Sequence, residues 1–257
     1  MLLMGRLLWR PTSASARVWV GASWFAAQMV ALSISVAAVA VLFGAVAAVA
    51  AWQVMTRWVS RPTLPSLVIA ATAATALPVS AAFGGARLVG GVLLFGVVLS
   101  FALADLVRVD KVGRLVRAGW LVQAWFPAGF AASCVVLTAS YELGAAVILL
   151  WLVAVYDAGE YLVGADASVA YVGPLAGVFG AWIAAFTLVE LGIPPLDRTS
   201  VWRFGLLATV ALPLGPIVGS MVLPSATSLA PMLRRLDSLL VMAPAWAWMI
   251  GLLLQDL

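Results

Sequence analysis

The chain has 257 residues, of which 65% are hydrophobic and only 9% are charged, against roughly 45–50% apolar and 25% charged in a typical soluble domain. Its mean hydropathy is +1.14, and apolar residues run along the whole length, so one protein core of this size cannot bury them. These numbers exclude a soluble globular protein. We therefore expect a polytopic membrane protein, in which lipid is the solvent for most side chains.

The composition also excludes several kinds of catalytic site. The sequence has no histidine and one cysteine, Cys134, which removes Ser-His-Asp triads, imidazole-bound metals and disulfide frameworks. Cys134 stands in an apolar stretch and is expected to be a small buried hydrophobe. Any catalysis must use carboxylates, basic side chains, backbone groups or a hard metal ion such as Mg²⁺. The net charge of +4 does not indicate a nucleic-acid partner, because cytoplasmic loops of membrane proteins collect Lys and Arg.

The sequence predicts that the chain is divided into two segments. Residues 1–17 carry three arginines and a short apolar run, which is typical of a cytoplasmic N-terminal segment that is retained. Residues 18–257 form a single integral membrane domain. The uncharged stretch Val18–Met55 leaves two alternatives open, because one helix of this length would be roughly 57 Å long against a hydrocarbon core of ~30 Å. It is either one long helix or two spans with a turn near Ser33–Ser35.

The distribution of cations favours two spans in that stretch and about nine in total. With nine spans, eleven of the fourteen Lys and Arg residues fall on one side and Arg87, Arg198 and Arg203 on the other. One long helix would give a split of eight against six, with almost no bias. The positive-inside rule therefore predicts an all-α, polytopic transmembrane helical bundle in the cytoplasmic membrane, with the N-terminus cytoplasmic and the C-terminus outside. Beyond Met55, the predicted spans are 64–83, 88–104, 118–139, 143–156, 169–192, 204–223 and 238–254.

Carboxylates at membrane depth are costly and are therefore the first candidates for function. Asp105, Asp157, Glu160 and Asp237 lie near the predicted cytoplasmic face, whereas Glu190 lies near the outer end of its span, where snorkelling or helix capping is expected. Asp157 and Glu160 are three residues apart and share one helix face at the start of a predicted loop 157–168. The same acids are also compatible with ordinary interfacial helix ends.

Twelve tryptophans bear on the boundaries of the membrane, because tryptophan is enriched at membrane–water interfaces. Trp151 and Trp182 are predicted to lie deeper in their spans than the other ten. The ten that lie near predicted span ends, as an interfacial belt requires, are Trp9, Trp19, Trp24, Trp52, Trp58, Trp120, Trp125, Trp202, Trp246 and Trp248.

Three segments, in this order and spacing, resemble the phosphatidate cytidylyltransferase (CDP-diacylglycerol synthase) family. They are D-A-G-E-Y-L-V-G at 157–164, G-P-I-V-G-S-M at 215–221 and L-R-R-L-D-S-L-L-V-M-A-P at 233–244. A-A-W-Q at 50–53 and the basic loop 108–117 are also similar, so the likeness covers most of the chain. The resemblance implies a homodimeric membrane enzyme that uses Mg²⁺ to convert CTP and phosphatidic acid into CDP-diacylglycerol and pyrophosphate.

The resemblance also implies roles for individual residues. Asp157 and Asp237 would be the catalytic and metal-binding acids. Two positions depart from the pattern, since Pro216 and Arg234 stand where the family's motifs have acids. A basic segment is missing as well, because no Lys or Arg occurs from 118 to 197. The residues expected to bind substrate are Gly159, Tyr161, Gly164, Ser220, Arg234, Arg235 and Ser238.

Three functions follow, and the departures favour the first. The first is a catalytically degenerate relative of the cytidylyltransferases that needs no cofactor. It would bind membrane lipids such as phosphatidic acid and act as an accessory subunit of a membrane protein complex. The alternative is an active, divergent nucleotidyltransferase that uses CTP and Mg²⁺ to make CDP-diacylglycerol or a related CDP-lipid in phospholipid synthesis. An unrelated small transporter or structural membrane protein is the third. Each lost charge-stabilising group can cost about two to three orders of magnitude in rate.

Overall fold

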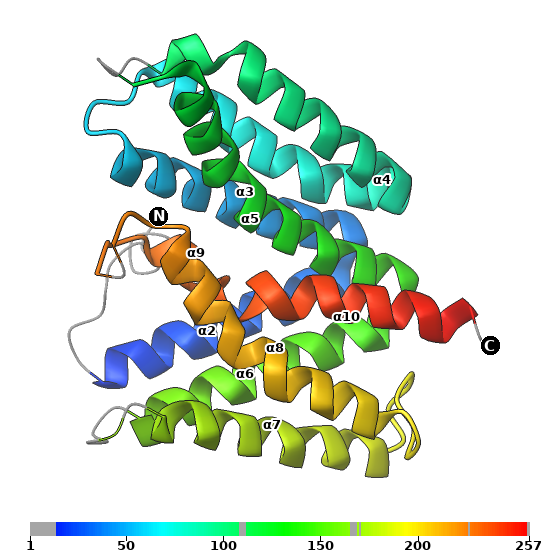
Figure 1. Cartoon of the computed structure of the whole chain (residues 1–257). Coiled ribbons are helices and arrows are strands. Elements are labelled where there is room, and N and C mark those ends of the chain that lie inside the picture. The colour runs from blue at the N-terminus through cyan, green and yellow to red at the C-terminus, as the bar shows by residue number, and fades with distance from the viewer. Residues whose placement is uncertain (1–13, 108–111, 165–168, 170, 226, 256–257) are drawn as a thin grey trace.

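The computed structural model describes residues 14–107, 112–164, 169, 171–225 and 227–255, and these contain helices and no strand. The prediction of an all-α protein is therefore confirmed, whereas most of the predicted N-terminal segment 1–17 lies outside the described residues. Figure 1 shows the helices side by side in one bundle. They are α2 (Ala14–Ile34), α3 (Val36–Trp58), α4 (Leu64–Ala102), η1 (Ala104–Leu106), α5 (Arg114–Tyr141), α6 (Leu143–Gly164), α7 (Val172–Glu190), α8 (Val201–Met221), α9 (Pro231–Arg234) and α10 (Asp237–Gln255).

The long apolar stretch at the start of the described chain forms two helices that meet at Ser35. Ser35 has an extended backbone (φ −176°, ψ 163°), and its side-chain oxygen accepts a hydrogen bond from the Ala38 backbone N–H at 3.1 Å. This is an N-cap, which satisfies one of the free N–H groups at the start of α3. The turn that the sequence predicts near Ser33–Ser35 is therefore present.

Helix α4 reverses direction at Gly85. A straight helix of its 39 residues would be roughly 58 Å long, yet the Thr63 hydroxyl just before it donates to the Leu106 carbonyl just after it, at 2.7 Å. Gly85 provides the reversal, because its backbone (φ 61°, ψ −160°) is non-helical and lies in a region that favours glycine. Figure 1 follows this chain out and back, from cyan to green. The element thus consists of two antiparallel arms, 64–84 and 86–102.

The described helices have the length and composition of a membrane protein. Seven of them are long and apolar enough to cross a bilayer, with α4 taken as one helix, and Val18–Ile34 is a shorter apolar helix. A typical span needs about 20 predominantly apolar residues. The prediction of an integral membrane protein made of transmembrane helices is supported, while the number of crossings depends on how α2 and the two arms of α4 are counted.

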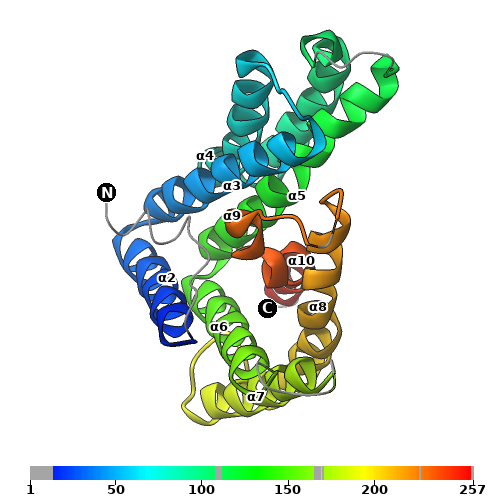
Figure 2. The ribbon, with the colours of Figure 1, turned by 90° about the vertical axis from the view of Figure 1, so that its left-hand side faces the viewer.

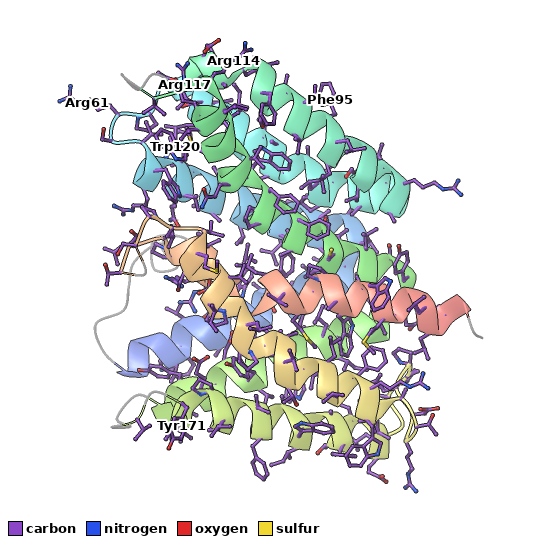
Figure 3. The ribbon with its side chains drawn as sticks, in the orientation of Figure 1. Arg61, Phe95, Arg114, Arg117, Trp120 and Tyr171 are labelled. Atoms are coloured by element: carbon purple, nitrogen blue, oxygen red, sulfur yellow. The ribbon has the colours of Figure 1, made fainter. Side chains whose placement is uncertain are left out.

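The loops gather at two ends of the bundle. One end, which we call the basic end, comprises 56–63, 103–107, 112–117, 169, 171, 222–225 and 227–236, and hydrogen bonds join α3 and α5 to the segment after α8. The Trp58 indole and the Gln123 amide both donate to the Val222 carbonyl, at 2.8 and 3.1 Å, and Arg57 Nε donates to the Leu229 carbonyl at 2.8 Å. Figure 3 shows Arg61, Arg114, Arg117 and Tyr171 on this side. The opposite, distal end comprises 34–35, 85–87, 141–143 and 191–200.

The centre of the bundle contains many alanines together with large side chains, among them two tryptophans. Figure 2 views the bundle from the basic end, with α3, α4 and α5 on one side, α6, α7 and α8 on the other, and α10 between them. Trp125 on α5 and Trp246 on α10 are only 1% and 0% exposed. Of the two roles expected for the tryptophans, an interfacial belt or packing within the protein, these two have the second. Their indole N–H groups donate within the protein, to Ser100 Oγ at 3.0 Å and to the Ala145 carbonyl at 3.2 Å, which lets the rings be buried.

Candidate functional site

Asp157 and Glu160 lie within helix α6 and not in a loop. The sequence predicts that this span ends at 156 and that 157–168 is a polar loop, but the helix continues to Gly164. Two acids of the candidate site are therefore held on a regular backbone, one turn apart. Tyr161 is half-buried on the next position, and residues 165–168 lie outside the described residues.

The helix continues because its two glycines pack against two glycines of α7. A Cβ atom at Gly159 would lie 3.0 Å from the Gly177 Cα, and one at Gly164 would lie 2.9 Å from the Gly173 Cα. Glycines at such spacing let helix backbones approach closely, which compensates for their low helix propensity. In this structure Gly159 and Gly164 serve helix packing, and the substrate-binding role implied for them stays a prediction.

Asp237 begins α10 and is held by Arg234. The carboxylate is part of a residue only 6% exposed, and its Oδ2 accepts from Arg234 Nη1 at 2.9 Å. The same Nη1 donates to the Ser220 hydroxyl of α8 at 3.1 Å. Gly219 lies directly against Oδ1 of the same carboxylate. Ser220, Arg234 and Asp237, which the sequence names as site residues, are thus brought together.

A second contact joins this group to α6. The Ser238 hydroxyl of α10 donates to Asp157 Oδ1 at 2.5 Å. Because Ser238 directly follows Asp237, this bond brings the acids of the two resembling segments close together. Arg235 also lies near Asp157. Burial lowers the pKa of its guanidinium, and the negative charge of Asp157 opposes that shift. The structure thus brings Asp157, Asp237 and the two arginines close together.

The donors in this cluster fit Mg²⁺ poorly. A magnesium ion needs oxygen ligands in octahedral geometry, with one or two carboxylates free to bind it. Here Asp157 is bonded to Ser238, and the Arg234 guanidinium lies beside Asp237, where it repels a cation. Among the described residues no group of three or more His, Cys, Asp or Glu side chains is placed to hold a metal ion. One oxygen, Asp237 Oδ1, is buried without a hydrogen-bond partner within the described structure.

The structure also forms a surface of arginines and tryptophans that was not predicted from the sequence. We call it the basic surface and define it by Arg57, Arg61, Arg114, Arg117, Trp58 and Trp120. The two indoles stack with centroids 6.3 Å apart. Asp105 is the acid beside it, 2.9 Å from Arg117 and 3.8 Å from Arg114. Arginines from separate parts of the sequence lie on this side because α3 ends and α5 begins here, so only the order of the loops could have indicated the surface.

The comparisons with known proteins add no family. No protein-family model matches the chain, and no curated protein matches it. The resemblance to phosphatidate cytidylyltransferases therefore rests on the sequence segments named above.

Proposed function

We propose that this membrane protein is a catalytically degenerate relative of phosphatidate cytidylyltransferases that binds lipid as an accessory subunit of a membrane complex. The observation that carries the proposal is the contact between Arg234 and Asp237. The resemblance implies an acid at position 234, and a cation at that place removes a metal ligand and neutralises the remaining one. Metal-assisted transfer of a cytidylyl group depends on metal ions that neutralise phosphate charge.

The balance of charge in the cluster supports the same proposal. Arg234 binds Asp237 and Arg235 lies near Asp157, so these two carboxylates are offset by guanidiniums before any ligand arrives, and Glu160 is a third acid close to both. Strong binding of a divalent cation requires an excess of negative oxygen ligands. The α6–α8–α10 cluster is then a structural joint between helices, and the chain contributes lipid contacts and not chemistry.

The lipid contact is proposed for the basic surface. It has four arginines and two tryptophans, and Asp105 neutralises part of the positive charge. This composition is expected at the headgroup level of an anionic membrane. Phosphatidic acid, which carries its phosphate as a monoester, is the proposed ligand because arginine binds such groups through two parallel hydrogen bonds. We further propose nine crossings, with α2 and both arms of α4 counted separately, and the basic end in the cytoplasm.

An enzymatic assay tests the loss of catalysis. Purified full-length protein is incubated with CTP, Mg²⁺ and phosphatidic acid, and CDP-lipid and pyrophosphate are measured, with a known active cytidylyltransferase as the positive control. We expect no product above a protein-free background, and no change in the Asp157→Asn and Asp237→Asn variants. Synthesis of CDP-lipid by the wild type that both substitutions abolish would establish the alternative function, an active divergent nucleotidyltransferase.

A lipid-retention assay tests the binding role separately. Native mass spectrometry of the detergent-purified protein compares bound phosphatidic acid with bound phosphatidylcholine. We expect Arg61→Gln together with Arg114→Gln to reduce retention of phosphatidic acid by about tenfold, since each arginine–phosphate contact contributes on the order of 1 kcal/mol. Arg87→Gln, at the distal end, is the matched control and should retain the wild-type amount. Equal losses in both variants would contradict a binding surface at the basic end.

A further inference from the structure

Three aromatic side chains form a cluster near the distal end, away from the acids discussed above. Trp182 and Phe186 come from α7 and Trp202 from α8, and their ring centroids lie 5.1–5.6 Å apart. The Trp182 indole donates to the Thr209 hydroxyl at 2.8 Å, which fixes its ring. Trp202 is 61% exposed, so part of the cluster is accessible from outside the protein.

A cavity of about 270 Å³ opens beside this cluster, and its wall carries one acid and one cation. Phe186, Trp202, Val189 and Val201 line its apolar side, and Glu190 and Arg198 its polar side. Arg198 Nη2 lies 2.8 Å from Glu190 Oε2. Asp197 is held in the turn before α8, where its Oδ1 accepts from the Ser200 and Thr199 backbone N–H groups at 2.6 and 3.0 Å.

The Glu190–Arg198 pair can exchange partners at little cost. Both side chains are mostly exposed, at 61% and 80%, and exposed pairs contribute little net stability because water solvates the separate charges well. A ligand that brings its own cation and anion can replace one weak pair with two. Its ammonium group would lie at Glu190 and over the indole face of Trp202, where a cation–π contact adds to the attraction. Its phosphate would lie at Arg198.

We propose that this cavity binds the headgroup of a zwitterionic phospholipid, an amino-alcohol phosphate that carries one ammonium and one phosphate group. The two charges of the headgroup match the two charges of the cavity wall, and the aromatic face suits an alkylated ammonium best. The lipid source is favoured over a free headgroup because exposed apolar side chains continue from the cavity along both helices, namely Phe179, Ile183 and Leu206. These would contact the acyl chains of the same lipid.

The test measures lipid binding to purified full-length protein and its variants by native mass spectrometry. Short-chain phosphatidylcholine and phosphatidylethanolamine are compared with phosphatidylglycerol, which lacks the ammonium group, and with free phosphocholine. We expect preferential binding of the two zwitterionic lipids. Glu190→Gln and Trp202→Leu should each weaken that binding by about five- to tenfold, as loss of a cation contact predicts. Free phosphocholine should bind at least tenfold more weakly than the lipid, because it has no chains.

Two controls keep the result specific to the cavity. Arg203→Gln changes an exposed cation that neighbours Trp202 but does not line the cavity, and binding should be unchanged. The double exchange Glu190→Arg with Arg198→Glu keeps an ion pair between the two positions but puts a cation where the ammonium group of the lipid would bind beside Trp202. Binding of zwitterionic lipid should therefore fall, while the melting temperature stays the same. Binding that ignores the headgroup, or that survives the double exchange, would overturn the proposal. Equal affinity for free phosphocholine would overturn its assignment to a lipid.

Discussion

The hydroxyl of Ser238 and the carboxylate of Asp157 form a 2.5 Å hydrogen bond between residues 81 positions apart in the sequence. The bond ties α6 to the first turn of α10 near the basic end. Asp237 is next to this bond and binds Arg234, which also donates to Ser220 of α8. This small group of contacts therefore connects α6, α8 and α10. The buried or half-buried polar groups of three helices bind one another here, so loss of either contact should destabilise the bundle.

Removal of the Ser238 hydroxyl should weaken the contact between α6 and α10. We expect Ser238→Ala to lower the unfolding free energy by about 1 kcal/mol, since Asp157 loses its hydrogen-bond donor. Thermal unfolding of the detergent-purified protein measures the effect. Ser33→Ala is the matched control, because the Ser33 hydroxyl is exposed and donates within its own helix at 2.8 Å. Equal melting temperatures for the two variants would refute a role for the bond in stability.

Arg234 and Asp237 should behave as one unit in a double-mutant cycle. Arg234→Gln leaves the Asp237 carboxylate buried and unpaired, and breaking such a pair costs about 3 kcal/mol. Asp237→Asn should cost less, since Arg234 is partly exposed and can be solvated. We expect the double variant to be less destabilised than the sum of the single variants, by about 1 kcal/mol or more. Additive effects would mean that the two side chains do not interact in solution.

The glycine contacts between α6 and α7 should tolerate no side chain. A Cβ at Gly177 would lie 2.7 Å from the Tyr156 carbonyl oxygen, so Gly177→Ala has to move backbone and should cost about 1–3 kcal/mol. Gly91→Ala provides the comparison, because a Cβ at Gly91 meets no atom within 4 Å and alanine has the higher helix propensity. The two melting temperatures should therefore shift in opposite directions, and a common shift would disprove the close packing.

The reversal of α4 predicts which cysteines can be cross-linked. In a Cys134→Ala background, Thr63→Cys and Leu106→Cys should be joined by a short bifunctional maleimide, since the two residues are in contact at the basic end. Thr63→Cys with Arg87→Cys should remain unlinked, because Arg87 lies just beyond the reversal at Gly85. Electrophoretic mobility after proteolysis between the sites reads out the link. Cross-linking of the second pair alone would require a different path for α4.

Accessibility of single cysteines tests the proposed orientation. With Cys134 replaced by alanine, Val112→Cys should react with a membrane-impermeant maleimide only after the cells are permeabilised, because it lies in the basic end that the positive-inside rule places in the cytoplasm. Leu191→Cys, an exposed residue of the distal end, should react in intact cells. The reverse pattern would invert the topology, although the internal arrangement of helices would stay valid.

Some features could be predicted from sequence because they depend on local patterns. Hydropathy indicated a membrane protein, and the length of the first apolar stretch together with the distribution of cations indicated the break that the structure has at Ser35. The end of α6 could not be predicted in this way. Glycine and two acids suggest an exit from a helix at 157–164, and the helix persists only because Gly173 and Gly177 come from α7 to pack there.

The sequence by itself determined that lipid surrounds this protein and which few side chains carry charge, because composition fixes how much apolar surface must leave water. It could name Asp157, Arg234 and Asp237 but not their partners. Tertiary structure alone decided that Asp157 accepts from Ser238, that Arg234 donates to Ser220 of α8, and that Trp125 and Trp246 are core residues. The physical reason is that a charge or an indole N–H at membrane depth needs a partner, and only the packing of distant helices determines which group is close enough to be that partner.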